Sequence, residues 1–512
     1  GGFFMHSREG LETPYLSEEW MDHIRKSAAY GKQHGLLPYI YDEDKWPSGM
    51  AGGKIAAIHP EFRATAITLC TDHVNCQYQY CAELDGHMLL SLRNGNEPTG
   101  KEARIGIAVE QSGTSDWYSG SAPSDNLNPQ SVQEFLRLTH EAYRRSFGGS
   151  LTGKIEGFFT DEPNFCDFFA TFTKGRPWLP WTACFADYFS ALRGYDICPY
   201  LPYLFYEGRH SVKTRHDYWK TLTELFQQSY FQQLFDWCEK NHVKSCGHLL
   251  FENGLGYQAR VCGAAMPHYK YFHVPGIDIL GERTEEYLTV KQCTSVANQY
   301  RRPAISETYG CSGWQFTFEG QKWVWDWQAV MGFSIRCQHL AQYSIKGLRK
   351  RDYPPFFNYQ SVWWKYDHVM ENYCARVSAC VKAGEAVRPI LVLHPQSSVW
   401  CQCGSRDDED LSHFDGNMGW TDPHITGINK EYDTLNRFVQ ALLLRQCDFD
   451  FGDELLLAQD GCVRDGQLFA ARAGYQLVIV PCCKNLFSTT LHLLRRFSDQ
   501  GGRIVWIGTL PE

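Results

Sequence analysis

Short apolar runs that end in polar or acidic residues alternate with amphipathic segments from residue 2 to residue 384. This alternation is typical of strand–helix units that follow one another around a parallel sheet. The pattern predicts seven buried strands, at residues 2–6, 36–41, 155–160, 244–249, 276–280, 303–307 and 335–343. Helices are predicted between them, at residues 17–34, 129–146, 212–241, 285–300, 321–332 and 364–384.

Eight strands of this kind close a (β/α)₈ barrel, and seven are visible. The simplest account is that the first strand–helix unit lies upstream of Gly1, so that the visible strands are numbers two to eight. Residues 52–128 carry alternating polar and apolar runs instead, which predict a β-rich insertion in the loop after strand three. The predicted fold of residues 1–385 is therefore an α/β TIM barrel with this insertion.

A second unit is predicted after residue 385. Buried-type strands at residues 388–394, 477–481 and 503–508 combine with helices at residues 431–447 and 489–501. This order indicates a doubly wound α/β domain over residues 386–512. Because only three of its strands are visible before Glu512, we expect this domain to be C-terminally incomplete.

The charge distribution excludes one class of partner. The net charge is -9, and Lys and Arg are spread along the chain, so the sequence does not have the basic footprint of a nucleic-acid-binding protein. No apolar stretch approaches the ~20 residues that cross a bilayer. Aromatic residues reach 15%, with 16 Trp and 28 Tyr. Many stand beside Gly, Pro, Asp or Glu, where flat rings suit a carbohydrate cleft.

The 20 cysteines are not spaced as a disulfide framework or a metal-ligand motif. Their close pairs are Cys401 with Cys403 and Cys482 with Cys483. We expect most of them to be reduced and buried, and this favours a cytoplasmic protein.

Two glutamates stand out because barrel enzymes place their reactive groups at the carboxyl ends of strands. Residues 157–163 form an apolar strand that ends in Asp161, Glu162 and a proline, and residues 304–310 form a strand that ends in Glu307. In the inferred numbering these are strands four and seven. Cleavage of a glycosidic bond needs two carboxyl groups, one protonated and one ionised, so we predict that Glu162 and Glu307 are catalytic.

The segments around these acids resemble bacterial glycoside hydrolases related to the family 106 α-L-rhamnosidases, and the strand-four and strand-seven pair is also the arrangement of glycoside hydrolase clan A. The resemblance covers most of the chain, at residues 1–11, 15–20, 41–49, 159–163, 306–310, 349–355 and 387–395. It implies that Glu162 is the acid, that Glu307 is the base or nucleophile, and that residues 386–512 are flavodoxin-like or glutamine-amidotransferase-like. Likeness to family 106 favours inversion at the sugar carbon and clan A geometry favours retention, so both stay open.

Further polar and aromatic side chains at strand ends are candidates for binding sugar hydroxyls or stacking on sugar rings. They are His6, Arg8, Asp42, Glu43, Trp46, Asp161, His248, Glu252, Tyr309, Trp314, His339 and Tyr343. Asp278, on strand six, is a further candidate outside this set.

The predicted partner is an oligosaccharide or glycoside, cut at its terminal sugar, with no nucleic acid and no membrane. A homo-oligomer stays open. No cofactor is predicted; the family likeness allows a calcium ion near the cleft, although the sequence has no defined loop for it. Two alternatives remain, a retaining clan A enzyme such as a β-galactosidase and a catalytically inactive sugar-binding protein.

Overall fold

The computed structural model describes residues 1–8, 10–70, 76–165, 177–405, 414–415, 419–420, 423–508 and 510. Its central element is a parallel sheet of seven strands in the order β1-β2-β7-β10-β11-β12-β13. These are β1 (Gly2–Met5), β2 (Leu37–Tyr41), β7 (Gly157–Thr160), β10 (Lys244–Gly247), β11 (Val274–Ile279), β12 (Ile305–Thr308) and β13 (Ile335–Gln338). Each of the seven predicted strands is confirmed, and they are neighbours in chain order.

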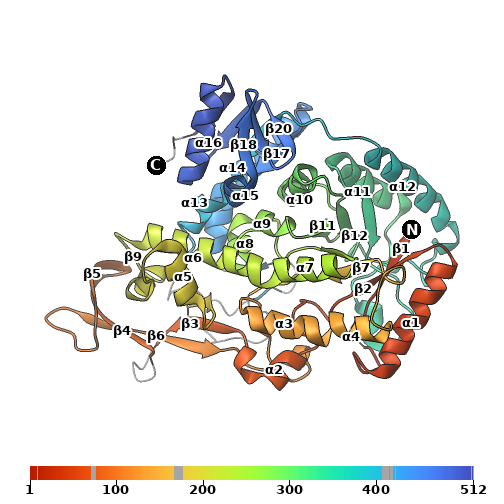
Figure 1. The fold of residues 1–512 in the computed structure, drawn as a ribbon, viewed down its shortest axis with the longest axis horizontal. Helices are drawn as coiled ribbons and strands as arrows, with labels where there is room; N and C mark the ends of the chain where they lie inside the picture. The colour runs from red at the N-terminus through yellow and green to blue at the C-terminus, as the bar shows by residue number, and fades with distance from the viewer. Residues whose placement is uncertain are drawn as a thin grey trace.

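Helices connect successive strands (Figure 1). The helix after β1 is α1 (Glu18–Gln33), and its N-cap Ser17 accepts a hydrogen bond from the Trp20 amide. The single helix predicted at residues 129–146 is divided into α3 (Pro129–Leu138) and α4 (His140–Ser146). Thr139 leaves the helical conformation between them, and its hydroxyl donates to the Phe135 carbonyl at 2.7 Å.

The other helices of this part follow the predicted pattern. The segment at residues 212–241 is α6 (Ser211–Phe226), the π-helix η4 (Gln227–Gln232) and α7 (Gln233–Lys240). Later connections are α8 (Leu255–Cys262), α9 (Met266–Tyr269), α10 (Tyr287–Gln299), α11 (Phe318–Met331) and α12 (Asp367–Lys382). Shorter helices are α2 (Lys54–Ile58), α5 (Phe185–Arg193), η1 (Pro60–Phe62), η2 (Asp116–Tyr118), η3 (Cys198–Leu204), η5 (Gly347–Arg351) and η6 (Trp364–Tyr366).

A second, mostly antiparallel sheet has the order β8-β3-β6-β4-β5-β9 and reaches away from the parallel sheet (Figure 1). Its strands are β3 (Thr65–Leu69), β4 (Tyr78–Asp85), β5 (Met88–Asn94), β6 (Ala103–Gln111), β8 (Trp178–Trp181) and β9 (Glu207–Gly208). The sequence predicted a β-rich insertion confined to residues 52–128. The structure adds β8 and β9 from the connection after β7, because β8 pairs with β3 and β9 pairs with β5.

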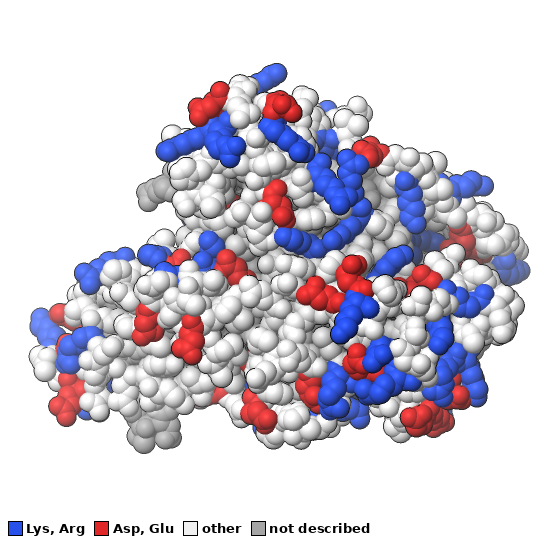
Figure 2. Space-filling model, in the orientation of Figure 1, with Lys and Arg blue, Asp and Glu red and all other residues white. Residues whose placement is uncertain are grey.

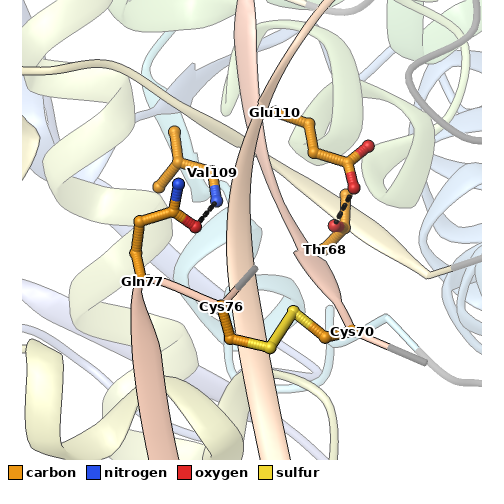
Figure 3. Close-up of a disulfide and its surroundings, with 6 residues drawn as sticks. All are labelled: Thr68, Cys70, Cys76, Gln77, Val109 and Glu110. Carbon is orange, nitrogen blue, oxygen red and sulfur yellow. Dashed lines mark hydrogen bonds between the residues drawn. A yellow bond between two sulfur atoms is a disulfide. The ribbon is translucent and has the colours of Figure 1, made fainter. Parts of the chain in front are cut away.

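A disulfide joins Cys70, just after β3, to Cys76, just before β4 (Figure 3). In sheet order β6 lies between these two strands, so the bond passes over β6. A Cβ atom at Gly106 would lie 2.3 Å from Cys76 Sγ, which explains why glycine occupies this point of β6. One disulfide is compatible with the expectation that most cysteines are reduced, and Cys238, Cys246 and Cys262 are buried free thiols.

Residues beyond α12 build a four-stranded parallel sheet in the order β17-β14-β21-β22. Its strands are β14 (Ile390–Leu393), β17 (Phe449–Gly452), β21 (Leu477–Pro481) and β22 (Arg503–Ile507). The remaining elements are α13 (Gln396–Trp400), α14 (Pro423–Leu444), α15 (Glu454–Asp460), α16 (Ser488–Asp499), β15 (Phe414–Asp415), β16 (Gly419–Trp420), β18 (Gly461–Arg464), β19 (Gln467–Ala470) and β20 (Ala473–Tyr475). The sequence pattern missed β17 because the buried Asp450 interrupts its apolar run.

Asp450 links this sheet to the preceding helices. Its carboxylate accepts hydrogen bonds from Arg388 Nη1 at 2.8 Å, Tyr475 Oη at 2.9 Å and Asn298 Nδ2 at 2.6 Å. Arg388 also donates to the Met331 carbonyl at the end of α11. Buried charges are stabilised when every hydrogen-bonding group has a partner, so this network holds the two parallel sheets in one arrangement.

Basic and acidic side chains are interspersed over the face drawn in Figure 2, as the sequence predicted from its spread of charges. Among the described residues, no helix has the length and apolar character needed to cross a bilayer.

Candidate active site

The two predicted catalytic glutamates line one cavity of about 430 Å³ at the carboxyl end of the parallel sheet. Glu162 follows β7, and Glu307 lies in β12. Of the predicted site residues, Arg8, Trp46, Asp161, Glu162, Glu252, Glu307 and His339 line this cavity. The structure therefore brings together side chains that are up to 331 positions apart in the sequence, between Arg8 and His339.

Glu162 has a strained backbone. Its φ angle is +49°, in the left-handed region, although it precedes Pro163. Asn164 Nδ2 donates to the Glu162 carbonyl at 2.9 Å, and Asn126 Nδ2 donates to the Asn164 carbonyl at 2.9 Å. Strain of this kind persists where the surrounding structure holds it, and it is concentrated at functional sites.

The environment of Glu162 favours its protonated form. Burial raises the pKa of Glu162 well above its usual value, and the negative charge of Asp161 acts in the same direction. A glutamic acid that keeps its proton at neutral pH can donate it to a leaving oxygen.

The neighbouring carboxylates share a histidine. His248 follows β10 and is 1% exposed, and its Nε2 lies 3.1 Å from Asp161 Oδ1 and 2.9 Å from Glu307 Oε2. Burial opposes a charge on the ring, but hydrogen bonds with Asp161 and Glu307 raise the pKa of His248 well above its usual value. The same contact lowers the pKa of Asp161 against the opposing effect of burial. The raised pKa favours the imidazolium form of His248, whose Nε2 bridges the two carboxylates.

A second pair of acids, Glu252 after β10 and Asp278 in β11, comes from the two strands between β7 and the strand of Glu307 in the sheet order. Asp278 in β11 is the register partner of Glu307 in β12, so the two side chains project from the same face of the sheet. Glu252 accepts hydrogen bonds from Tyr269 Oη at 2.6 Å, from the Leu249 amide at 3.1 Å and from the Asp278 amide at 3.4 Å. Burial raises the pKa of Glu252 to about 7 and raises that of Asp278 well above its usual value.

Arg8 connects the two edge strands of the parallel sheet. It follows β1 and forms a bidentate ion pair with Asp352, at 2.7 and 3.0 Å, in the segment after β13. His6 packs on the Tyr41 ring with centroids 3.4 Å apart, and its Nε2 lies 3.3 Å from Arg8 Nη1. His339 Nε2 lies 3.8 Å from Glu307 Oε1. Arg8 and His339 line the cavity on the side of β1 and β13, whereas His6 is outside its lining.

Several predicted binding residues lie elsewhere. Asp42 and Glu43 are fully buried, and neither lines the cavity. Glu43 accepts hydrogen bonds from the backbone amides of residues 49–52 and of Asp44, so it shapes the loop that carries Trp46. Asp42 accepts from the Ser48 hydroxyl at 2.6 Å. Their positions contradict direct contact with a sugar in this cavity.

Three predicted aromatic contacts are also outside the cavity lining. Tyr309 is fully buried, and its hydroxyl donates to the Gln321 carbonyl at 2.8 Å. Trp314 is 40% exposed and packs edge-on against Phe356, and Tyr343 is 95% exposed. Proximity in sequence to Glu307 or to strand eight did not predict their positions, because the local backbone after each strand decides which side chains reach the cavity.

Part of the cavity lining could not be predicted from the sequence. Phe251, Cys311 and Tyr353 line the cavity, and each has a φ angle between +52° and +64°. No residue type in these segments signals a left-handed backbone, so only the structure could place them. Asp278 was visible as an acid on strand six, but its position beside Glu307 depends on strand register.

Asp161, His248 and Glu307 are the one described group with the spacing of a metal site, with ligand atoms within 4.8 Å of one another. Calcium prefers oxygen ligands, whereas one of the three candidate ligand atoms here is the imidazole nitrogen of His248. The short distances from His248 Nε2 to both carboxylates fit a proton on Nε2 that both carboxylates accept in a hydrogen bond, without a metal ion between them. These three residues do not fit the calcium ion that the family likeness allows.

Comparison with known proteins finds similarity to glycoside hydrolases. Residues 123–408 match the glycoside hydrolase 106 family, described as alpha-L-rhamnosidase. A putative beta-glucuronidase of Formosa agariphila is 22% identical over 346 residues, which are 65% of this chain and 26% of that protein. This chain thus spans about a quarter of that relative's length.

Solved structures show the fold. A rhamnosidase from Novosphingobium sp. PP1Y is similar with a TM-score of 0.62 at 12% identity, over 100% of this chain and 66% of that chain. A GH42 beta-galactosidase from G. stearothermophilus is similar with a TM-score of 0.53 at 11% identity, over 96% of this chain and 64% of that chain. These likenesses confirm the predicted α/β barrel class.

Proposed function

Because this chain belongs to glycoside hydrolase family 106, the α-L-rhamnosidase family, we propose that it hydrolyses the bond to a terminal α-L-rhamnose or a closely similar neutral sugar. The observation that carries this proposal is the convergence of Glu162 and Glu307 on one cavity. Burial raises the pKa of Glu162 and so favours its protonated form, while His248 Nε2 lies 2.9 Å from Glu307 Oε2 and orients that carboxylate.

The chemistry follows from the placement of Glu162 and Glu307 on one cavity. Glu162 donates its proton to the glycosidic oxygen as the bond from that oxygen to the anomeric carbon breaks. Glu307 either takes a proton from a water molecule that attacks the same carbon, which inverts the configuration, or bonds to the carbon first and is displaced by water, which retains it. His248 contacts both Asp161 and Glu307, and this bridge holds the Glu307 carboxylate in place.

A uronic acid fits this cavity poorly. The two arginines that line the cavity both form ion pairs within the protein, Arg8 with Asp352 and Arg283 with Glu286 at 3.2 Å. A sugar carboxylate would instead face the acids Asp161, Glu252 and Glu307. Like charges at short range disfavour binding, so the charge pattern supports a neutral terminal sugar.

The test is a panel of 4-nitrophenyl glycosides, with α-L-rhamnopyranoside included, assayed on the wild type and on Glu162→Gln and Glu307→Gln variants. We expect cleavage of the rhamnoside and a loss of about 10³-fold or more in kcat for each variant. A 2,4-dinitrophenyl leaving group needs no acid, so it should restore the Glu162→Gln variant and leave the Glu307→Gln variant inactive. NMR of the first product gives the anomer.

Asp326→Asn provides the matched control, because Asp326 pairs with Lys322 on α11, outside the cavity. Cleavage that is unchanged in both glutamine variants would overturn the assignment of the catalytic pair. Sugar binding by a wild type that cleaves no glycoside would favour the sugar-binding alternative.

A further inference from the structure

Asp278 lines the cavity next to Glu307 and has one carboxyl oxygen without a hydrogen-bond partner among the described residues. This oxygen, Oδ1, is buried from solvent. Buried polar atoms in native proteins are almost always paired, and each exception calls for a reason. A ligand in the cavity would supply the missing partner.

The position of Asp278 is fixed by the sheet. Because it is the register partner of Glu307 on the adjacent parallel strand, the two residues are about 4.8 Å apart across the sheet and project from the same face. Glu252 holds the backbone amide of Asp278 at 3.4 Å and is itself held by Tyr269. Any sugar whose anomeric carbon meets Glu307 therefore brings a neighbouring ring position to Asp278.

The neighbours of an anomeric carbon are the ring oxygen and the carbon that bears the 2-hydroxyl. Burial, and next the charge of Glu307, raise the pKa of Asp278, which favours the protonated carboxyl group, and that form offers both a donor and an acceptor. A hydroxyl group matches both functions. The ring oxygen accepts only, and it would leave the acceptor oxygen of Asp278 unpaired.

We propose that Asp278 is a specificity-determining residue that binds the 2-hydroxyl of the terminal sugar. This assignment rests on the proposed function, since it places the anomeric carbon at Glu307. Hydrogen bonds to the 2-hydroxyl strengthen in the transition state of glycoside cleavage, so Asp278 selects for that hydroxyl in kcat/KM. Glu252 acts as a positioning residue behind it.

The test compares 4-nitrophenyl α-L-rhamnopyranoside with its 2-deoxy analogue on the wild type, Asp278→Leu and Asp278→Asn. The quantity of interest is the ratio of the two kcat/KM values, because comparing ratios between variants cancels the intrinsic reactivity of the two substrates. Leucine fills the space without a polar atom. Asparagine keeps a neutral donor and acceptor.

We expect the Asp278→Leu ratio to fall about 30-fold or more below that of the wild type, while the Asp278→Asn ratio stays within about 3-fold of it. An unchanged ratio in Asp278→Leu overturns the proposal. Should Asp278→Leu fail to fold, as judged by circular dichroism, Asp278→Ser replaces it, with the same expected direction. Asp326→Asn is the control for a distant carboxyl-to-amide change.

A binding measurement separates this proposal from the proposed function. Titration calorimetry of L-rhamnose and 2-deoxy-L-rhamnose on the wild type and on Asp278→Leu needs no turnover. If no glycoside is cleaved but the wild type prefers L-rhamnose and Asp278→Leu does not, the proposed hydrolysis fails and the assignment of Asp278 stands. Equal affinity of the wild type for both sugars overturns it.

Discussion

Replacing His248 by glutamine should move the pH dependence of catalysis. His248 carries a positive charge between Asp161 and Glu307, and the three groups have atoms within 4.8 Å of one another. Glutamine can still donate one hydrogen bond but carries no charge. The variant therefore leaves two carboxylates close together without the cation that offsets their repulsion.

The size of the effect follows from that distance. Two unit charges 4.8 Å apart repel by about 3.5 kcal/mol at an effective dielectric constant of 20. One pH unit corresponds to about 1.4 kcal/mol, so the pair should retain one proton to a pH about 2.5 units higher than in the wild type. Because Glu307 must be ionised to act, the acidic limb of the pH–kcat/KM profile should rise by about 2.5 units.

The assay is kcat/KM for 4-nitrophenyl α-L-rhamnopyranoside between pH 4 and pH 9. A His248→Gln profile that falls uniformly at all pH values, with its acidic limb unmoved, would refute the reasoning. His273→Gln is the matched control, because His273, at the amino end of β11, pairs with Glu239 on α7, outside the cavity lining.

Thermal stability gives an independent readout of the same charge. The pKa of His248 is raised in the folded state, so its ionisation stabilises the fold fully below about pH 6.5, the value typical of an unfolded chain. That contribution is lost as the pH rises through the folded pKa. The Tm difference between wild type and His248→Gln should therefore be larger at pH 6 than at pH 9.

Three further changes test other parts of the structure. Glu43→Gln should lower the free energy of unfolding by about 2 kcal/mol in a urea titration, because the amide nitrogen turns one acceptor of the loop amides into a donor; unchanged stability would contradict the proposed role in the loop. Arg388→Met should lower it by about 3 kcal/mol, since the fully buried Asp450 loses its cation; an equal effect of Arg376→Met, on the exposed side of α12, would point to a nonspecific cause. Trp46→Ala should raise KM about 10-fold at nearly constant kcat, as expected for a ring that stacks on the sugar, and a fall in kcat alone would exclude this role.

The sequence by itself determined the seven strands of the parallel sheet and the two glutamates that meet at one cavity. Alternation of apolar and amphipathic segments fixes which residues are strands, and adjacent strands in a parallel sheet share one carboxyl edge, so Glu162 and Glu307 could be assigned to one site from their strand ends alone. Where a polar residue interrupts an apolar run for tertiary reasons, as Asp450 does in β17, this reasoning fails.

The tertiary structure alone decided which neighbours of the acids reach the cavity. Strand register places Asp278 beside Glu307, and left-handed backbone at Phe251 and Tyr353 turns those side chains inward. Asp42 and Glu43 have the residue types of a binding site but satisfy the protein's own amides and hydroxyls instead. The physical reason is that residue type sets what a side chain can bind, whereas burial and partners from distant segments set what is left for a ligand.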